Sequence, residues 1–565
     1  MMHRGLRFPL CPADRSLGRA VLLILLAIYT ATFNGLPAGP DGEVSFQTTS
    51  ALWRQQSFAL SGTPEAEALI EHADASEPGG FSVQRVVRDG EARYYGWFGI
   101  GQALGALPFY GAGKAMAQFA PSLATAHEGH LRYGASRSEY FEHLFVGWRN
   151  PLLTALTAML IVFAARRFGL APRTAFVAGL GYGLATFAWP QARANLSDVQ
   201  ATFLLTSALY AMLLEREEGG RRGAFIFGLS MGGAFLTRVA LAPAVVVLDI
   251  AFVSGLFRAH RRAADSIARQ PIRVSLGLAL LPQVVALGCW LLTNQMRFGS
   301  ALDSGYGLAL AGGLFGGDPI GALWGVTLSP GKGLIWMAPG VLLAVIGFRR
   351  ARREGEALLL TTFVGLLAAV FLPALLMGGW HGAYTYGPRY ILPALPALWL
   401  LAAIGFERSD VDARVRRVAH GLLAFGLMIQ IPAALVDTMT YHELAVVAAQ
   451  EHFEAPAALE EPSDIAAFRF AAMQFDWGYA APWAHWRILR HRVSQPGETF
   501  EVREIFRHDS ESLLTPAQMR ERGFQHLAWV DLQERLGGSI WPAVIFICLL
   551  LAGGVVATAR GLDAS

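Results

Sequence analysis

Charged residues are scarce in this sequence: they make up 16% of its 565 residues, against about 25% in a typical soluble domain. Only two of the 46 basic residues are lysines, and the three cysteines show no spacing typical of a zinc site or a disulfide framework. A formal net charge of +3 gives no support for nucleic-acid binding. P-loop and HExxH motifs are absent, which argues against ATP-driven transport by this chain alone.

What the sequence has instead is apolar residues, which make up 53% of the chain. They gather in blocks of about 17–25 residues, the length that crosses a bilayer as a helix. We therefore predict an all-α polytopic membrane protein with about twelve transmembrane helices. The candidate spans lie near 18–36, 148–165, 174–190, 197–214, 223–237, 239–257, 273–293, 333–348, 357–378, 389–406, 417–436 and 539–558.

Arginines predict the orientation of this bundle. The first span follows a basic tail without a clear cleavage site, so we interpret it as an uncleaved signal-anchor with a cytoplasmic N-terminus. The segments that then lie in the cytoplasm hold more than half of the 46 basic residues, as the positive-inside rule requires. We expect a multi-pass protein of the bacterial inner membrane, with both termini in the cytoplasm and the active site facing the periplasm or exterior.

This orientation divides the chain. Residues 1–436 form a transmembrane region whose first non-cytoplasmic loop covers about 37–147. Residues 437–538 form a small, mainly helical outer region, and residues 539–565 form the last helix with a cytoplasmic tail.

One apolar block, residues 94–119, tests the orientation. If it crossed the membrane, every later loop would invert and its arginines would lie outside. We interpret the block as interfacial or shallowly inserted, with its aromatic side chains at headgroup level. Its glycines could instead allow close helix packing. In the second outer region, 441–453 and 463–474 are helix-like.

Three carboxylates stand at the outer membrane boundary, where a charge is costly and therefore a functional candidate. Asp41 and Glu43 follow the first span, and Asp198 begins the fourth. The alternative for Asp41 is an N-cap of the following helix. Asp198 has nearly capping-box spacing with Asn195, so a structural role stays open for it as well.

Basic side chains share that boundary. A guanidinium binds phosphate oxygens through a planar fork, so several around one cavity predict a phosphate or pyrophosphate site at the membrane surface. Any one of them alone could simply reach the lipid headgroups. The candidates for donor phosphate binding are Arg193, Arg238, Arg297, Lys332 and Arg389.

Aromatic residues beside glycines complete the candidate set. Tyr306, Trp380, His381 and Tyr386 are candidate substrate contacts, because aromatic faces could stack on sugar rings. For any single aromatic residue among them, a role as an interface anchor is the favoured interpretation. His381 could be a metal ligand, a general acid or a plain hydrogen-bonding residue.

Four segments resemble the GT-C class of integral-membrane glycosyltransferases, above all bacterial relatives of the protein O-mannosyltransferases and the lipid A aminoarabinose transferases. The first is the signal-anchor followed by Asp41, Glu43 and FQTTSALWRQQ. The others are WPQARANLSDVQATFLLTSALY, which contains Asp198, then RFGSALDSGYG with LSPGKGLIWMAPG, and WHGAYTYGPRYILPALP.

The resemblance implies transfer of a sugar from a polyprenyl-phosphate donor to a lipid, glycan or protein acceptor on the non-cytoplasmic face. It implies a general base at Asp41, with Asp198 assisting by holding a metal or positioning the acceptor, and donor phosphate contacts from Arg238 and Arg389. A divalent ion such as Mg or Mn is the only cofactor implied. Direct displacement would invert the anomeric configuration. Because Asp-Gly-Glu stands where many members have adjacent acidic residues, the choice between Asp41 and Glu43 stays open.

Two other functions fit the same composition. A transporter or flippase of a lipid-linked sugar would usually show two related halves with interrupted spans, and we find no such internal symmetry. A non-catalytic envelope-assembly protein would use 437–538 as its binding face.

Overall fold

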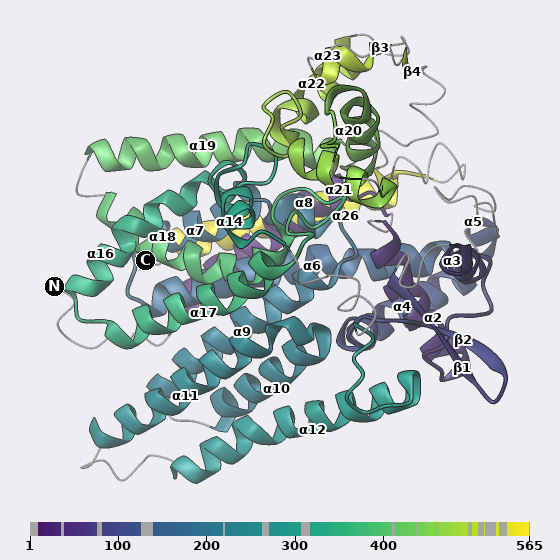
Figure 1. Ribbon diagram of the computed structural model, residues 1–565. Coiled ribbons are helices and arrows are strands. Elements are labelled where there is room, and N and C mark those ends of the chain that lie inside the picture. Colours follow the sequence, from purple (N-terminus) through teal and green to yellow (C-terminus); the bar gives the residue numbers. More distant parts are fainter. Residues whose placement is uncertain are drawn as a thin grey trace.

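The computed structural model is mostly helical (Figure 1). The residues it describes are 10–35, 39–75, 82–125, 139–218, 221–262, 271–306, 317–409, 413–436, 438–457, 459, 461–494, 500–506, 513–514, 527–529 and 539–563.

Long helices form a bundle that holds most of the buried apolar core. Trp399 is fully buried at its centre, and its indole N–H donates to the carbonyl of Ala178 at 2.8 Å. The bundle comprises α1 (Pro12–Thr32), α6 (Tyr140–Arg167), α7 (Pro172–Leu184), α8 (Ala188–Ala192), α9 (Ser197–Glu218), α10 (Arg221–Thr237), η2 (Val239–Leu241), α11 (Ala242–Arg262), α12 (Ile272–Phe298), α14 (Pro319–Leu328), α15 (Leu334–Met337), η3 (Pro339–Leu343), α16 (Ala344–Arg353), α17 (Ala357–Leu376), η4 (Arg389–Ala394), α18 (Leu395–Ser409), α19 (Ala413–Leu435) and α26 (Trp541–Asp563).

Within the described residues, nine helices are long and apolar enough to cross a membrane. They match nine of the twelve predicted spans, so the expectation of an all-α polytopic membrane protein is confirmed. The segments at 174–190 and 223–237 form the shorter helices α7 and α10, of 13 and 17 residues. The segment at 333–348 is not one helix: it breaks at Pro339, whose ring cannot continue a helix, into α15, η3 and α16.

The first and last helices pack together although they are far apart in the sequence. Gly554 and Gly561 on α26 lie against Ile24 and Leu17 of α1, where an added Cβ would approach side-chain carbons within 2.6 Å. Such small residues let helix backbones approach closely in a membrane.

Smaller elements lie at the end of the bundle that is remote from the chain termini (Figure 1). Strands β1 and β2 form an antiparallel hairpin that pairs Val83 with Gly96 and Arg88 with Glu91, which our sequence reading did not predict. These elements are α2 (Pro40–Gln55), α3 (Pro64–Ala75), β1 (Val83–Arg88), β2 (Glu91–Gly96), α4 (Gly101–Phe119), α5 (Pro121–Thr125), α20 (Thr438–His452), α21 (Pro462–Ala472), α22 (Ala481–Ser494), β3 (Phe500–Glu501), α23 (Val502–Phe506) and β4 (Leu513–Leu514).

Helices α20 and α21 coincide with the helix-like stretches predicted at 441–453 and 463–474. The block at 94–119 begins in β2 and continues as α4, which is not among the nine candidate spans. Helix α4 packs against α6. Gly113 makes this possible, because a Cβ there would lie 2.5 Å from the Cα of Glu142.

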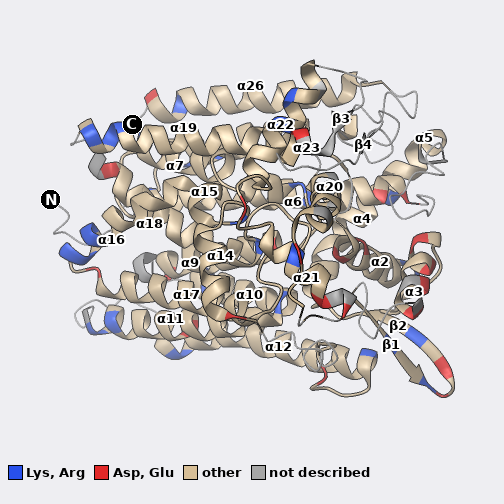
Figure 2. Ribbon diagram, turned by 45° about the horizontal axis from the view of Figure 1, so that its top comes forward, with Lys and Arg blue, Asp and Glu red and all other residues tan. Residues whose placement is uncertain are grey.

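Charge is distributed unevenly along the bundle. In Figure 2, Lys and Arg gather at the end that carries both termini and α16, while acidic residues are frequent around α2, α3 and the hairpin. The arginines at the end of α16 (Arg350, Arg352 and Arg353) belong to the basic end. This is the separation that the arginine pattern predicts.

Candidate active site

Asp41 lies in the first turn of α2, after Gly39, whose φ of +80° suits glycine. One carboxylate oxygen, Oδ1, accepts a hydrogen bond from the Ser82 hydroxyl at 2.8 Å. The other, Oδ2, accepts from Nη2 of Arg389 at 3.1 Å. Gly39 occupies the N-cap position and makes no side-chain cap, so Asp41 does not act as the N-cap.

Asp198 lies in the first turn of α9 and is almost fully buried. Its Oδ1 accepts from Nη1 of Arg238. Asn195 does not form a capping box with it: the Asn195 side chain accepts from Arg149 at 3.1 Å and donates to the carbonyl of Gly42 at 3.3 Å. The loop before α9 is therefore tied to the start of α2, which brings the two aspartates to one region.

Tyr390 joins the two aspartate–arginine pairs. The guanidinium of Arg238 lies 5.4 Å from the centre of its ring, and that of Arg389 lies 4.9 Å from it. Arg389 also donates to the Tyr390 hydroxyl at 3.2 Å. We call these five residues, Asp41, Asp198, Arg238, Arg389 and Tyr390, the arginine–aspartate cluster.

Two atoms of this cluster are buried without a hydrogen-bond partner among the described residues. They are the Asp198 carboxylate oxygen Oδ2, an acceptor, and Nε of Arg389, a donor. Buried polar atoms in native proteins are nearly always hydrogen-bonded. An unmatched acceptor and an unmatched donor in one charged cluster leave two polar atoms available to a ligand.

Tyr306 lies beside the cluster. Burial raises the pKa of Tyr306, and the nearby charges of Arg238, Asp41 and Arg389 also act on its phenol. Its ring stacks on Trp97 with centres 6.0 Å apart. Tyr306 and Trp97 therefore supply an aromatic wall next to the charged groups.

Glu43 is directed elsewhere. Its carboxylate lies 3.1 Å from Nε2 of the buried His143 and accepts from Gln47 at 2.7 Å. Positions two apart on a helix differ by about 200° in direction, so Asp41 and Glu43 cannot face the same site from α2. The Asp41 side chain is 31% exposed and that of Glu43 is 5% exposed, so Asp41 is the more accessible carboxylate.

Two of the arginines predicted to bind phosphate donate hydrogen bonds to backbone carbonyls. Arg193 donates to the carbonyls of Ala433 and Val436 near the end of α19. Arg297 donates to the carbonyls of Gly96 and Phe98, which ties α12 to the hairpin. The structure does not bring either guanidinium into the arginine–aspartate cluster.

Lys332 and His381 lie near Arg389. The buried ammonium of Lys332 donates to the carbonyls of Ala383, at 3.1 Å, and Thr385. Burial, with the charge of Arg389, holds the pKa of Lys332 well below its usual range. Burial, with the charges of Lys332 and Arg389, lowers the pKa of His381 to about 3. His381 is therefore neutral at ordinary pH, and its Nδ1 accepts from the backbone N–H of Ala383.

Trp380 and Tyr386 are buried packing residues. The Trp380 ring lies against Gly325 of α14. The Tyr386 backbone carbonyl accepts from Gln191 at 2.6 Å, and its hydroxyl donates to the carbonyl of Ile429. Both hold the loop before η4, from which Arg389 projects.

A divalent metal fits the described residues poorly. The two carboxylates of the arginine–aspartate cluster are each matched by a guanidinium. Among the described residues, no group of three His, Cys, Asp or Glu side chains is placed to hold a metal ion.

Tyr390 and Ser82 are the contacts that the sequence did not suggest. Tyr390 directly follows Arg389 in the segment GPRYILP, and that adjacency is its only sequence signal. Ser82 precedes a strand that was not predicted.

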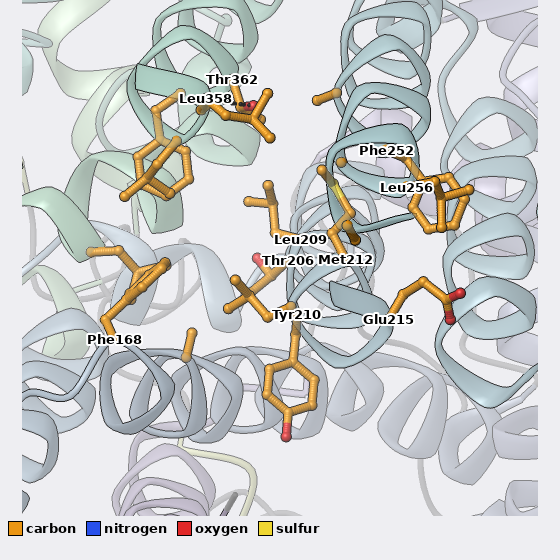
Figure 3. Close-up of a pocket in the computed structure, with 18 residues that line it drawn as sticks. Phe168, Thr206, Leu209, Tyr210, Met212, Glu215, Phe252, Leu256, Leu358 and Thr362 are labelled. Carbon is orange, nitrogen blue, oxygen red and sulfur yellow. Dashed lines mark hydrogen bonds between the residues drawn. The ribbon is translucent and has the colours of Figure 1, made fainter. Parts of the chain in front are cut away.

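A separate apolar pocket lies between α9, α11 and α17 (Figure 3). Its lining includes Leu209, Phe252 and Leu358, and one ionisable carboxylate, Glu215. Leu358 stands at the beginning of α17, whereas the arginine–aspartate cluster adjoins the loop after that helix. None of the predicted site residues lines this pocket.

No family model matches the sequence. Over 109 residues the chain is 36% identical to the undecaprenyl phosphate-alpha-4-amino-4-deoxy-L-arabinose arabinosyl transferase of Aeromonas salmonicida (strain A449), a match that spans 19% of this chain and 20% of that protein. The chain is thus similar to an aminoarabinose transferase, as the sequence resemblance predicts.

Solved structures show further similarity. ArnT from Cupriavidus metallidurans in the apo state aligns with a TM-score of 0.44 and 15% identity, over 96% of this chain and 76% of that one. The archaeal oligosaccharyltransferase AglB from Archaeoglobus fulgidus, in complex with an inhibitory peptide and a dolichol-phosphate, aligns with a TM-score of 0.36 and 12% identity, over 79% and 61%.

Proposed function

We propose that this protein transfers a sugar from a polyprenyl-phosphate donor to an acceptor lipid, glycan or protein. The observation that carries the proposal is the arginine–aspartate cluster with its unmatched buried atoms, Nε of Arg389 and Oδ2 of Asp198. A phosphate supplies acceptor oxygens for the first, and an acceptor hydroxyl or amine supplies a proton donor for the second.

The donor phosphate would bind between Arg238 and Arg389. Both guanidinium groups pack on Tyr390, and both remain charged at ordinary pH. A bound phosphate would share these arginines with Asp41 and Asp198, because each guanidinium carries five N–H donors. A lipid-linked donor already carries its phosphate leaving group, which is consistent with a chain that lacks a P-loop.

The chemical step follows from these positions. A lone pair of the acceptor oxygen or nitrogen attacks the anomeric carbon, and the proton passes to the Asp41 carboxylate. The bond from the anomeric carbon to the phosphate oxygen breaks, and its electron pair stays with the departing polyprenyl phosphate. Arg238 and Arg389 stabilise the charge that develops there. Displacement in one step inverts the anomeric configuration.

Asp198 would position the acceptor. Its Oδ1 is held by Arg238, so its Oδ2 is fixed in direction and can accept a hydrogen bond from the nucleophile. The step uses no metal ion, because each carboxylate is already matched by an arginine.

The similarity over 109 residues to an undecaprenyl phosphate-dependent arabinosyl transferase supports undecaprenyl phosphate as the carrier to test first. The charge separation supports a bacterial inner-membrane location, with the basic end and both termini in the cytoplasm and the arginine–aspartate cluster at the outer face. In this orientation, the hairpin and helices α20 to α22 lie on the same side as the cluster.

The test is sugar transfer by purified protein in lipid nanodiscs, with Asp41→Asn and Asp198→Asn. Each variant should lose transfer. Asp41→Asn should keep its thermal unfolding temperature, whereas Asp198→Asn weakens a buried ion pair and should lower it, so transfer is compared in the folded fraction. The matched control is Asp74→Asn, an exposed carboxylate that pairs with Arg85 on the hairpin and should leave transfer unchanged.

The variant Glu43→Gln distinguishes the role of Glu43 from that of Asp41, the other carboxylate of α2. We expect it to lower stability, because it disturbs the buried contact with His143, while it retains transfer in the folded fraction. Full transfer by both Asp41→Asn and Asp198→Asn would refute the proposed function. Inhibition by a metal chelator would contradict the metal-free step.

A further inference from the structure

Helix α14 is a short helix of the bundle with a large exposed apolar face. Ala322 and Val326, four residues apart, are buried. The opposite side carries large apolar side chains: Ile320 is 70% exposed and Trp324 is 56% exposed. No residue from Pro319 to Leu328 is charged, and the helix begins at an Asp318 N-cap that accepts from two backbone N–H groups.

The apolar surface continues beyond this helix. The Trp336 indole donates to the carbonyl of Leu328 at 2.9 Å, and its ring meets that of Trp477 edge to face at 5.1 Å. Trp477 and Phe475, in the loop between α21 and α22, are about half exposed. We define the α14 patch as Ile320, Leu323, Trp324, Leu328, Phe475 and Trp477.

The patch adjoins the membrane-facing surface of a spanning helix. Helix α14 packs against α17, and a Cβ added at Gly317 would lie 2.9 Å from the Cα of Gly378, just after the end of α17. At that end of α17, Leu372 and Leu376 are exposed, as lipid-facing residues of a span are. Helix α14 therefore stands beside a span end that exposes apolar side chains.

Length excludes a further crossing. Ten residues of helix extend for about 15 Å, whereas the hydrocarbon core is about 30 Å thick. Tryptophan is enriched where the acyl chains meet the headgroups. We infer that the α14 patch lies in the bilayer interface on the side of the arginine–aspartate cluster, in contact with phospholipid of that leaflet.

This contact with lipid would fix the position of the chain segment that runs from α14 toward the arginine–aspartate cluster. Helix α14 leads directly into the turn of Lys332, whose backbone N–H donates to the Ser329 hydroxyl at 3.1 Å. In the same turn, the N–H of Gly331 donates to the carbonyl of Gln474 at 3.0 Å. The lipid-bound helix therefore holds together the Lys332 turn and the region that contains α21, whatever reaction the cluster performs.

The test uses spin labels on the full chain in nanodiscs of phosphatidylethanolamine and phosphatidylglycerol. Cys11, Cys289 and Cys548 are first replaced by serine. Leu323→Cys then carries a nitroxide, and its accessibility to oxygen is compared with that to a water-soluble nickel complex. Asp89→Cys, at the exposed turn of the hairpin, gives the aqueous reference, and Val285→Cys, exposed on the span α12, gives the membrane reference.

We expect the ratio of oxygen to nickel accessibility at 323 to be several-fold above that at 89 and below that at 285. Leu328→Cys gives the same readout if Leu323→Cys fails to fold. A ratio equal to that at 89 would overturn the inference. Spin–spin broadening that disappears on dilution with unlabelled protein would overturn it in favour of a second copy of this chain.

Discussion

At the scale of single residues, Arg238 and Arg389 present two like charges to one tyrosine ring. Each is paired with an aspartate, and each lies within cation–π distance of Tyr390. The ring contacts both guanidinium groups and so helps to hold each of them in place. Tyr390 is therefore a positioning residue for the two phosphate ligands of the proposed reaction.

Replacing Tyr390 tests this role. A cation–π contact contributes about 0.5–2 kcal/mol, so Tyr390→Leu, which removes both, should raise the KM for the donor roughly tenfold. Tyr390→Phe keeps the ring and loses only the hydrogen bond from Arg389, so its KM should rise much less. Steady-state kinetics with varied donor measure both.

A purely structural Tyr390 would give a different result. Leucine and phenylalanine would then lower the amount of active protein without changing KM. Equal KM values for the two variants would contradict the positioning role.

Helix geometry also decides which partners the two neighbouring acidic residues contact. Asp41 and Glu43 are neighbours in the sequence, yet one meets Arg389 and the other meets His143. Their separation follows from the helical geometry of α2, which turns side chains two positions apart to opposite sides.

At the scale of elements, glycines decide which helices come close. Helix α4 lies against α6 at Gly113, where the backbone of Glu142 occupies the space that a side chain would need. Helix α6 also carries His143 and Arg149, which contact Glu43 and the loop before α9. The α4–α6 contact therefore supports the region on which Asp41 and Asp198 stand.

Gly113→Ala should destabilise the protein. Its Cβ would lie 2.5 Å from a backbone carbon, so the helices must separate, and overpacking of this kind costs about 1–3 kcal/mol. The matched control is Gly277→Ala on α12, where a Cβ meets nothing within 4 Å. Thermal unfolding in detergent, followed by circular dichroism, should show a lower midpoint for Gly113→Ala alone. Equal midpoints would contradict the close contact.

Hydropathy did not predict that the segment at 333–348 forms several short helices. Its composition suits a span, and proline is tolerated in membrane helices when neighbours satisfy the backbone. Here the chain turns at Ala338, with φ −151° and ψ 63°, and continues as separate short helices. Lys332 precedes these short helices, and its ammonium is held against the loop before η4 by the carbonyls of Ala383 and Thr385.

At the scale of the whole molecule, the charge separation along the bundle predicts its orientation. The end of the bundle with α16 is basic, while the hairpin lies at the opposite end (Figure 2). The arginine–aspartate cluster adjoins the hairpin, because Ser82, just before β1, donates to Asp41. Because basic residues are retained in the cytoplasm, the hairpin should face the periplasm or exterior.

Cysteine labelling in intact cells measures this orientation. In a cysteine-free background, Asp89→Cys should react with a membrane-impermeant maleimide. Arg353→Cys, at the exposed end of α16, should react only after the cells are permeabilised. The reverse pattern would invert the bundle and move the proposed active site to the cytoplasmic face.

The sequence by itself determined the properties that are local along the chain. Block length and hydropathy predicted nine spans that the structure contains, and the arginine pattern predicted the basic end. The cost of charge at a membrane boundary pointed to Asp41, Asp198, Arg238 and Arg389, which the structure brings into one cluster.

Only the tertiary structure decided which of these groups meet. Asp41 and Arg389 are 348 positions apart, and Arg193 and Arg297 stand at equally suitable boundaries yet bind backbone carbonyls. The reason is physical: in a membrane helix both the lipid-facing and the buried side are apolar, so hydropathy does not reveal how each helix is rotated. Close contacts such as that at Gly113 fix those rotations, and with them the side chains that share a site.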